Sequence, residues 1–179
     1  MVKLVYGFII GGVVVLVFSL VTASQFERTS TVKFCSSCHE MTVFNDTWSE
    51  GPHGLVHQGA IRAKCTDCHL PHTGVLRYIG AKIYYGINDY LAHVTGKKAT
   101  TKHWLEHWEG KKPYVHKAYV SGCKKCHKEI IGNGVPIKAI LAHKAYLIGE
   151  TKKNCVSCHH MVGHGDVLSV LREKTGSKM

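Results

Sequence analysis

One short motif occurs four times in this chain and contains every cysteine that the chain has. Each copy reads Cys-x-x-Cys-His, the attachment signature of a c-type haem, in which two thiols bond to one porphyrin and the histidine lies close to its iron. A zinc site, a redox-active dithiol or a disulfide would explain one such pair, but four copies with no spare thiol favour haem. We therefore predict four covalently bound haem c groups, attached through Cys35, Cys38, Cys65, Cys68, Cys123, Cys126, Cys155 and Cys158.

The chain is short for four haems. About 155 residues follow the first two dozen, which is fewer than about 40 per haem and too few to build an ordinary apolar core as well. We therefore expect a mostly α-helical protein with much irregular coil, in which the haems form the core. The motifs begin at positions 35, 65, 123 and 155, so that two short intervals flank a long one. This spacing predicts two dihaem halves, at about residues 25–96 and 97–179.

The formal net charge of +11 is typical of proteins that bind nucleic acid or an anionic membrane surface. Each haem, however, brings two propionates, so that four haems add about −8 and leave about +3. We therefore exclude nucleic acid as a partner.

An uncharged apolar run from Leu4 to Ala23 precedes the first motif. Twenty helical residues cover about 30 Å, the hydrocarbon thickness of a bilayer. A cleaved signal peptide is the competing interpretation, because the run ends in a passable cleavage site, but the run is longer than a usual signal-peptide core. We predict an uncleaved anchor, residues 1–24, in the cytoplasmic membrane. Lys3 should stay inside, so that the haem domain, residues 25–179, lies in a bacterial periplasm.

The clearest helix candidate runs from Thr73 to Thr95, where apolar residues recur at steps of three and four. Lys82 and Asp89 lie seven positions apart in it and therefore share one face. Two interpretations of these charges stay open: a helix packed on a haem with solvated side chains, or a helix at the membrane surface that offers proton-handling groups. A second helix is predicted around Thr101–Glu109, and one or two amphipathic turns after Asp166.

The irons of low-spin haems need a second strong ligand, so that histidines outside the motifs have to be shared among them. The expected proximal ligands of haems 2, 3 and 4 are the motif histidines His69, His127 and His159. His53 and His143 each precede a motif by twelve residues, and His164 lies between two glycines after the last motif. These three are the preferred second ligands. Four further histidines stay in reserve: His57, His72, His93 and His116.

The first motif continues Cys-His-Glu-Met, which places Met41 two residues after His39. A methionine thioether is a known ligand of haem iron and raises the reduction potential relative to two histidines. A methionine beside a haem also serves as packing. Both interpretations stay open on the residues alone.

Together these features resemble the NapC/NirT/NrfH family of membrane-anchored tetrahaem quinol dehydrogenases. The resemblance covers nearly the whole chain: the anchor, the four motif spacings, CHEM at 38–41 and CHLPH at 68–72. It implies that Met41 ligates haem 1 in place of the motif histidine, that Asp89 caps or faces the open side of that haem, and that Lys82 lines a quinol site beside it. It also implies that His53 serves haem 4 and that His164 serves haem 3.

One departure concerns haem 2. In the nitrite-reductase branch of the family, a lysine of the catalytic partner can ligate this haem, whereas here His143 is the repeat counterpart of His53. Pseudo-symmetry therefore predicts that His143 serves haem 2 and completes the set without a partner.

The resemblance implies a membrane-bound quinol dehydrogenase. Such a protein takes electrons from menaquinol or ubiquinol near haem 1 and passes them to a periplasmic reductase, with a multihaem nitrite reductase as the first candidate and nitrate reductase as the second. The alternative is a plain electron-transfer cytochrome without quinol chemistry. A terminal reductase is disfavoured, because no group of Arg, Tyr and His around one motif suggests an anion pocket.

Overall fold

The computed structural model describes residues 2–54, 62–96, 100–109 and 118–176. This part of the chain consists of helices and irregular coil without a strand, as the sequence predicted. Two helices are long, α1 (Val2–Arg28) and α5 (Val75–Val94). The other elements are short: α2 (Val32–Cys35), the 3₁₀ helix η1 (His39–Met41), α3 (Thr42–Glu50), α4 (Cys65–His69), α6 (Thr101–Trp108), α7 (Val120–Cys126), α8 (Ile137–Leu147), α9 (Cys155–Cys158) and α10 (Val167–Thr175).

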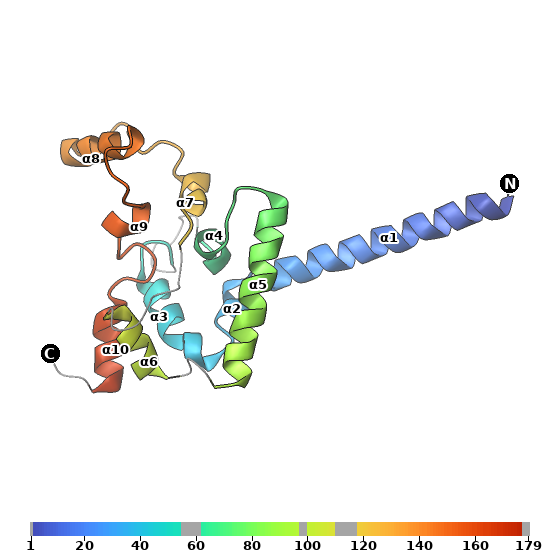
Figure 1. The fold of residues 1–179 in the computed structure, drawn as a ribbon, viewed down its shortest axis with the longest axis horizontal. Coiled ribbons are helices and arrows are strands. Elements are labelled where there is room, and N and C mark those ends of the chain that lie inside the picture. Colours follow the sequence, from blue (N-terminus) through green and yellow to red (C-terminus); the bar gives the residue numbers. More distant parts are fainter. Residues whose placement is uncertain (1, 55–61, 97–99, 110–117, 177–179) are drawn as a thin grey trace.

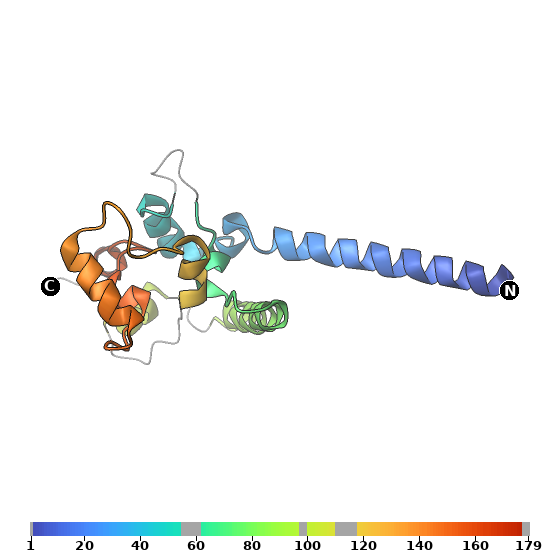
Figure 2. The ribbon, with the colours of Figure 1, turned by 90° about the horizontal axis from the view of Figure 1, so that it is seen from above.

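Helix α1 extends the predicted apolar run at both ends. Its 27 residues span about 40 Å, and its most apolar window has a mean hydropathy of 2.7. None of its residues is buried, and it projects from the rest of the molecule as one straight helix (Figures 1 and 2). Among the described residues it is the one helix long and apolar enough to cross a membrane, by length and composition.

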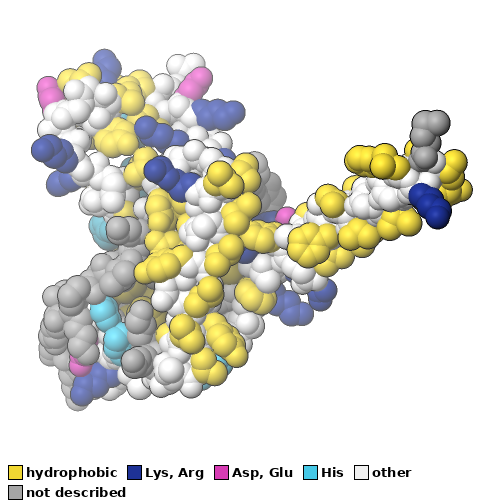
Figure 3. Space-filling model, turned by 45° about the vertical axis from the view of Figure 1, so that its right-hand side comes forward, with side chains coloured by type: hydrophobic (Ala, Val, Ile, Leu, Met, Phe, Trp, Pro, Cys, Tyr) yellow, Lys and Arg dark blue, Asp and Glu magenta, His cyan; other side chains and the backbone are white. Residues whose placement is uncertain are grey.

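Helix α5 matches the predicted helix to within two residues at its start and one at its end. It begins after Gly74, whose φ of +151° is readily adopted only by glycine. Both ribbon views show α5 running across the direction of α1, beside the end of α1 that meets the domain (Figures 1 and 2). The apolar stripe of α5 is exposed and forms a continuous hydrophobic strip in the space-filling view (Figure 3); it includes Val75, Ile83, Ile87, Tyr90 and Val94. Because this exposed apolar stripe runs across the direction of the membrane anchor, it is suited to contact with a lipid surface.

A small hydrophobic cluster joins α3, α6 and α10. Its buried members are Val43, Phe44, Leu105, Val167 and Leu171. The ring of Phe44 packs edge-to-face on Trp104, with ring centres 5.0 Å apart, a preferred geometry for an aromatic pair. Arg172 of α10 donates two hydrogen bonds of 3.2 Å to Glu109, just after α6, and so ties these helices together. In the described part of the chain only seven hydrophobic side chains are buried, which agrees with the expectation of little peptide core.

This cluster also bears on the proposed division into halves at about residues 25–96 and 97–179. It takes α3 from the first half and both α6 and α10 from the second. The two halves therefore share a peptide core, and their division into two dihaem units stays a prediction.

The second and third motifs meet where α4 contacts α7. The Tyr119 N–H donates to the Cys68 carbonyl at 2.8 Å, and Lys125 forms a 3.0 Å ion pair with Asp67. Gly122 is buried in this contact, and a Cβ placed on it would lie 1.9 Å from the Asp67 carbonyl oxygen. Only glycine permits the two backbones to come this close.

Replacing Gly122 with alanine is therefore expected to force α4 and α7 apart, at a cost of at least about 1–3 kcal/mol, the usual range for overpacking. The check is the midpoint of thermal unfolding of the haem-loaded protein. Gly132→Ala is the matched control, because an added Cβ there meets no atom within 4 Å. Equal unfolding midpoints for both variants would contradict the close contact.

Candidate haem sites and the membrane-proximal groove

Consecutive motifs are neighbours in space. The pKa of Cys65 is raised, first by a hydrogen bond with the Cys35 thiol and then by burial. Burial raises the pKa of Cys68, and the Cys126 thiol adds to this. Burial likewise raises the pKa of Cys123 to about 11, with a further contribution from Cys155. The first motif therefore adjoins the second, the second the third, and the third the fourth, an order that permits electrons to pass along the row.

Each motif histidine faces a histidine from elsewhere in the chain, and the pairs at the second, third and fourth motifs have similar surroundings. The ring centres lie 6.0 Å apart for His53 and His127, 6.1 Å for His69 and His164, and 6.1 Å for His143 and His159. Two imidazoles that bind one iron through nitrogens at about 2 Å have ring centres about 6 Å apart. Each pair is therefore spaced as an axial ligand pair would be.

The non-motif member of each pair is held in the same way. Nδ1 donates a hydrogen bond to a backbone carbonyl: from His53 to Val162 at 3.1 Å, from His143 to Ile130 at 2.6 Å, and from His164 to Phe44 at 2.9 Å. A carbonyl on Nδ1 fixes the tautomer and leaves Nε2 as the metal-binding nitrogen. Burial also lowers the pKa of His164, against the effect of the Phe44 carbonyl, and so favours the neutral ring that metals bind.

These residues fit haem, because the ring spacing and the Nδ1 hydrogen bonds both meet the needs of a six-coordinate iron. The ring pairs nevertheless differ from the expected assignments, and the ligands of each iron stay a prediction. His53 lies at the third motif rather than the fourth, and His164 at the second rather than the third. His143 lies at the fourth motif rather than the second. The two repeat counterparts differ in their surroundings, because His143 faces the motif that follows it, whereas His53 faces a motif of the other half.

The first motif has a different environment. Met41 is partly buried against the cluster of α3, α6 and α10, which is a packing role. Its role as an iron ligand stays a prediction. His39 faces the ring of His93 at 5.8 Å. Unlike the other three pairs, both of these rings turn Nδ1 toward one carboxylate, that of Glu40.

Lys82 and Asp89 both act on the first motif. The pKa of Cys35 is lowered first by its hydrogen bond with Cys65 and further by the Lys82 ammonium, while the Asp89 carboxylate opposes this. Lys82 donates to the Phe26 carbonyl at 2.7 Å and forms a short hydrogen bond with Ser30 Oγ. Its partial burial lowers its own pKa. Lys82 thus connects α5 to the end of α1, which the sequence did not indicate.

A groove of about 530 Å³ lies between α1 and α5. Its lining is mainly apolar and aromatic and comes from the last turns of α1, the residues just after it and the first turns of α5: Phe18, Ser19, Thr22, Ala23, Phe26, Glu27, Ser30, Tyr78 and Ile79. Two of these residues, Phe26 and Ser30, accept the hydrogen bonds of Lys82. The charged residue that lines the groove itself is Glu27.

Comparison with known proteins agrees with this architecture. Residues 1–169 match the model of the NapC/NirT cytochrome c family, N-terminal region. The chain belongs to this family. It is 31% identical to the tetraheme c-type cytochrome CymA of Shewanella oneidensis, over 87% of each chain. It is also 29% identical to the cytochrome c-type protein NapC of Paracoccus pantotrophus, over 77% of this chain and 60% of that protein.

A solved structure shares the fold. The crystal structure of the cytochrome c nitrite reductase NrfHA complex, bound to the HQNO inhibitor, contains a chain that matches with a TM-score of 0.53 at 23% identity. The match covers 88% of this chain and 90% of that chain. The chain is thus a NapC/NirT-family cytochrome of respiratory electron transfer, with covalently bound haem c and a single-pass membrane anchor. Four motifs agree with the tetraheme name of CymA.

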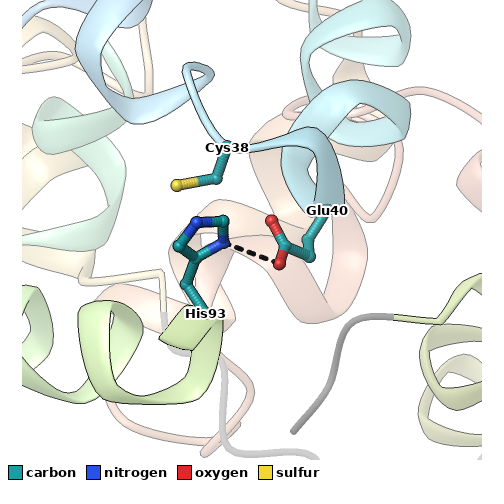
Figure 4. Close-up of side chains that lie close together, drawn as sticks. All are labelled: Cys38, Glu40 and His93. Carbon is teal, nitrogen blue, oxygen red and sulfur yellow. Dashed lines mark hydrogen bonds and ion pairs between the residues drawn. The ribbon is translucent and has the colours of Figure 1, made fainter. Parts of the chain in front are cut away.

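The remaining reserve histidines of this NapC/NirT-family chain have other surroundings or lie outside the described residues. His72 places Nε2 3.3 Å from the carbonyl of Thr66 in α4, and its ring packs on that of Tyr78. His57 and His116 fall outside the described residues. His93 lies beside the first motif, where its Nδ1 donates to Glu40 at 2.8 Å (Figure 4).

Proposed function

We propose that the chain oxidises menaquinol or ubiquinol at the groove between α1 and α5, next to haem 1, and passes the electrons through haems 2 to 4 to a periplasmic reductase. The observation that carries this proposal is the groove itself. Its lining is mainly apolar, it lies between the membrane helix and α5, and two of its lining residues accept hydrogen bonds from Lys82, which also acts on the first haem motif. These are the features that a lipid-borne ring with two hydroxyl groups requires.

The position of α5 supports the same function. Because α1 spans a bilayer and α5 runs across it, the exposed apolar stripe of α5 would rest on the membrane surface (Figures 1 and 3). Tyr84 and Tyr90 are exposed on this helix, and tyrosine is enriched at the interface between lipid and water. The groove would then open at the depth where quinol head groups lie.

We assign the axial ligands by the ring pairs: His69 with His164 for haem 2, His127 with His53 for haem 3, and His159 with His143 for haem 4. Met41 is the proposed ligand of haem 1. When bound, each haem accepts and passes on one electron at a time. The protein holds the rings in place through Nδ1 and keeps consecutive motifs in contact.

The charged residues of α5 have separate proposed roles. Oxidation of a quinol releases two protons with two electrons, so that a group near the substrate has to accept a proton. Asp89 is the proposed acceptor, since it lies on the face of α5 that acts on the first motif. Lys82 is the proposed hydrogen-bond donor to a quinol oxygen, in exchange for its bond to the Phe26 carbonyl.

The proposed electron acceptor is a multihaem nitrite reductase first and a periplasmic nitrate reductase second. Support for the first is the fold shared with a chain of a nitrite reductase complex. Support for the periplasm is the anchor, which has one lysine, Lys3, before the apolar run and therefore favours export of the haem domain.

The test is stopped-flow reduction of the haem-loaded protein in detergent by a menaquinol analogue. We expect rapid haem reduction, and slower reduction when HQNO, the inhibitor named with the similarly folded complex, is present. Dithionite reduction serves as the control for intact haems. If quinol reduces none of the haems while dithionite reduces all of them, the dehydrogenase function is wrong.

That outcome would favour the plain electron-transfer cytochrome. One observation already suits this alternative: Lys82 donates to the Phe26 carbonyl in the last turn of α1, where the helix dipole favours an ammonium, and to the hydroxyl of Ser30 just after α1. In the alternative, Lys82 only fastens α5 to the anchor. The two functions differ in whether quinol reduces the haems at all.

A further inference from the structure

The outer face of α8 is apolar and exposed. It consists of Ile137, Leu141 and Ile148, which are 76%, 61% and 70% exposed. At 3.6 residues per turn, these three lie within about 40° of one another around the helix, and about 120–160° away from His143. The ring of His143 faces that of His159 in the fourth motif. A haem held between these two histidines would therefore lie against the inner face of α8 and leave the outer face uncovered.

Lysines flank this apolar face. Lys138 and Lys144 are exposed on α8 itself, and each lies about 60° around the helix from Leu141, on opposite sides of it. The space-filling view shows basic side chains spaced around hydrophobic ones at this end of the molecule (Figure 3). The outer face thus has an apolar centre and a positively charged rim.

The segment that carries the fourth motif is basic as a whole. Residues 118–160 contain seven lysines against two acidic residues, Glu129 and Glu150, which leaves an excess of five positive charges. All seven lysines are exposed: Lys124, Lys125, Lys128, Lys138, Lys144, Lys152 and Lys153. Among the described residues, only Lys125 of these seven has an ion-pair partner, Asp67. The two propionates of the fourth haem would reduce the excess to three, so that the surface stays basic.

The position of α8 decides which kind of partner fits it. A basic helix with an apolar face can bind an anionic membrane surface or an acidic protein. Both ribbon views place α8 on the side of the domain opposite to α1 (Figures 1 and 2). Because α1 is the membrane anchor, α8 faces away from the bilayer. An acidic protein is therefore the better fit, and a second copy of this chain is a poor one, since its α8 would bring the same positive charge.

We propose that the outer face of α8 is the docking surface for a soluble electron-accepting protein whose entry site has an apolar patch and an acidic rim. An apolar centre inside a charged rim is the usual anatomy of a protein interface. A partner seated here lies over the fourth motif, so that one electron can leave the fourth haem and reduce the oxidised centre of the partner, with no bond made or broken. That this partner is a reductase rests on the proposed function, whereas the docking does not.

The test uses the haem-loaded full chain in nanodiscs of zwitterionic lipid, reduced with dithionite that is then removed. The electron-accepting probe is plastocyanin, a copper protein with an acidic patch beside an apolar one. Stopped-flow spectroscopy measures the rate of haem oxidation at several ionic strengths. Because dithionite supplies the electrons, the result does not depend on quinol oxidation, and a failure of the proposed function in the quinol experiment leaves this test intact.

For the wild type we expect fast electron transfer that slows as the ionic strength rises, since salt screens the attraction between the two surfaces. The double variant Lys138→Gln/Lys144→Gln should react at least about tenfold more slowly at low ionic strength, because it loses electrostatic steering. The difference should shrink in high salt. The matched control is Lys33→Gln/Lys102→Gln, which removes the same charge from exposed positions on α2 and α6 and should react like the wild type.

Two further measurements test the apolar centre and the sign of the charge. Leu141→Gln should slow electron transfer to plastocyanin at least about fivefold even in high salt, where the lysines are screened. With a basic cytochrome c as the acceptor, the wild type should react faster as salt rises, because repulsion is then screened.

The proposal is overturned if the two double variants react alike, or if Leu141→Gln reacts like the wild type. Hydrogen exchange of residues 137–147 decides against the competing occupant. Slower exchange in nanodiscs of anionic lipid than in zwitterionic ones would show that lipid covers α8, and would also overturn the proposal.

Discussion

Replacing Asp89 with asparagine is expected to slow haem reduction by quinol about 10²-fold or more, with reduction by dithionite unchanged. The expected size of this decrease in rate follows from the usual contribution of a positioned general base to catalysis. Asparagine keeps the shape and the hydrogen-bonding capacity of the side chain but cannot accept the proton that a quinol has to release. The measurement is the stopped-flow rate with a menaquinol analogue, at a quinol concentration high enough to saturate the wild type.

Two further variants make this result specific. Arg77→Gln removes a charge from the same helix, but from a residue that lines a separate pocket with Tyr84 and Tyr119, and should leave the quinol rate unchanged. Lys82→Met keeps the apolar stem of the side chain and removes its ammonium. It should weaken quinol binding, because the groove then lacks its charged donor. An Asp89→Asn protein that reacts with quinol as fast as the wild type would remove Asp89 from the mechanism.

Replacing His164 with alanine is expected to give one low-spin haem fewer per chain, and one new high-spin haem. The reason is that His164 stands 6.1 Å from His69, in ring-centre distance, with Nδ1 bonded to the Phe44 carbonyl. If His164 is the proposed second ligand of haem 2, its loss removes a strong axial ligand from that iron. The measurement is electron paramagnetic resonance of the oxidised protein, where a high-spin signal should appear and should vanish when imidazole is added.

The choice of haem also tests the pairing. His164→Ala should alter the haem that is attached at Cys65 and Cys68, whereas the pairing implied by family resemblance alone would alter the haem attached at Cys123 and Cys126. Paramagnetic NMR of the haem methyl groups distinguishes the two. His160→Ala is the matched control, because His160 is an exposed histidine beside the fourth motif. A new high-spin signal in the control, or none in His164→Ala, would contradict the assignment.

The sequence by itself determined the features that depend on local pattern. The motif C-x-x-C-H specifies covalent haem because its residues act within one turn of chain, and four copies identify a multihaem cytochrome. The anchor followed from the length of one apolar run, and α5 from apolar periodicity and its flanking residues. The family match over residues 1–169 agrees with these inferences.

Only the tertiary structure decided which groups meet across long stretches of chain. His69 and His164 are 95 positions apart in the sequence, and no local spacing states that they share a site. The contact exists because Phe44 of α3 packs against α6 and its carbonyl holds His164 ahead of α10. Likewise, Lys82 meets the end of α1 and His93 meets Glu40 only because α5 crosses the base of the anchor. Sequence patterns report the local free energy of a helix or a motif, whereas these pairings depend on how helices pack, and packing is a property of the whole fold.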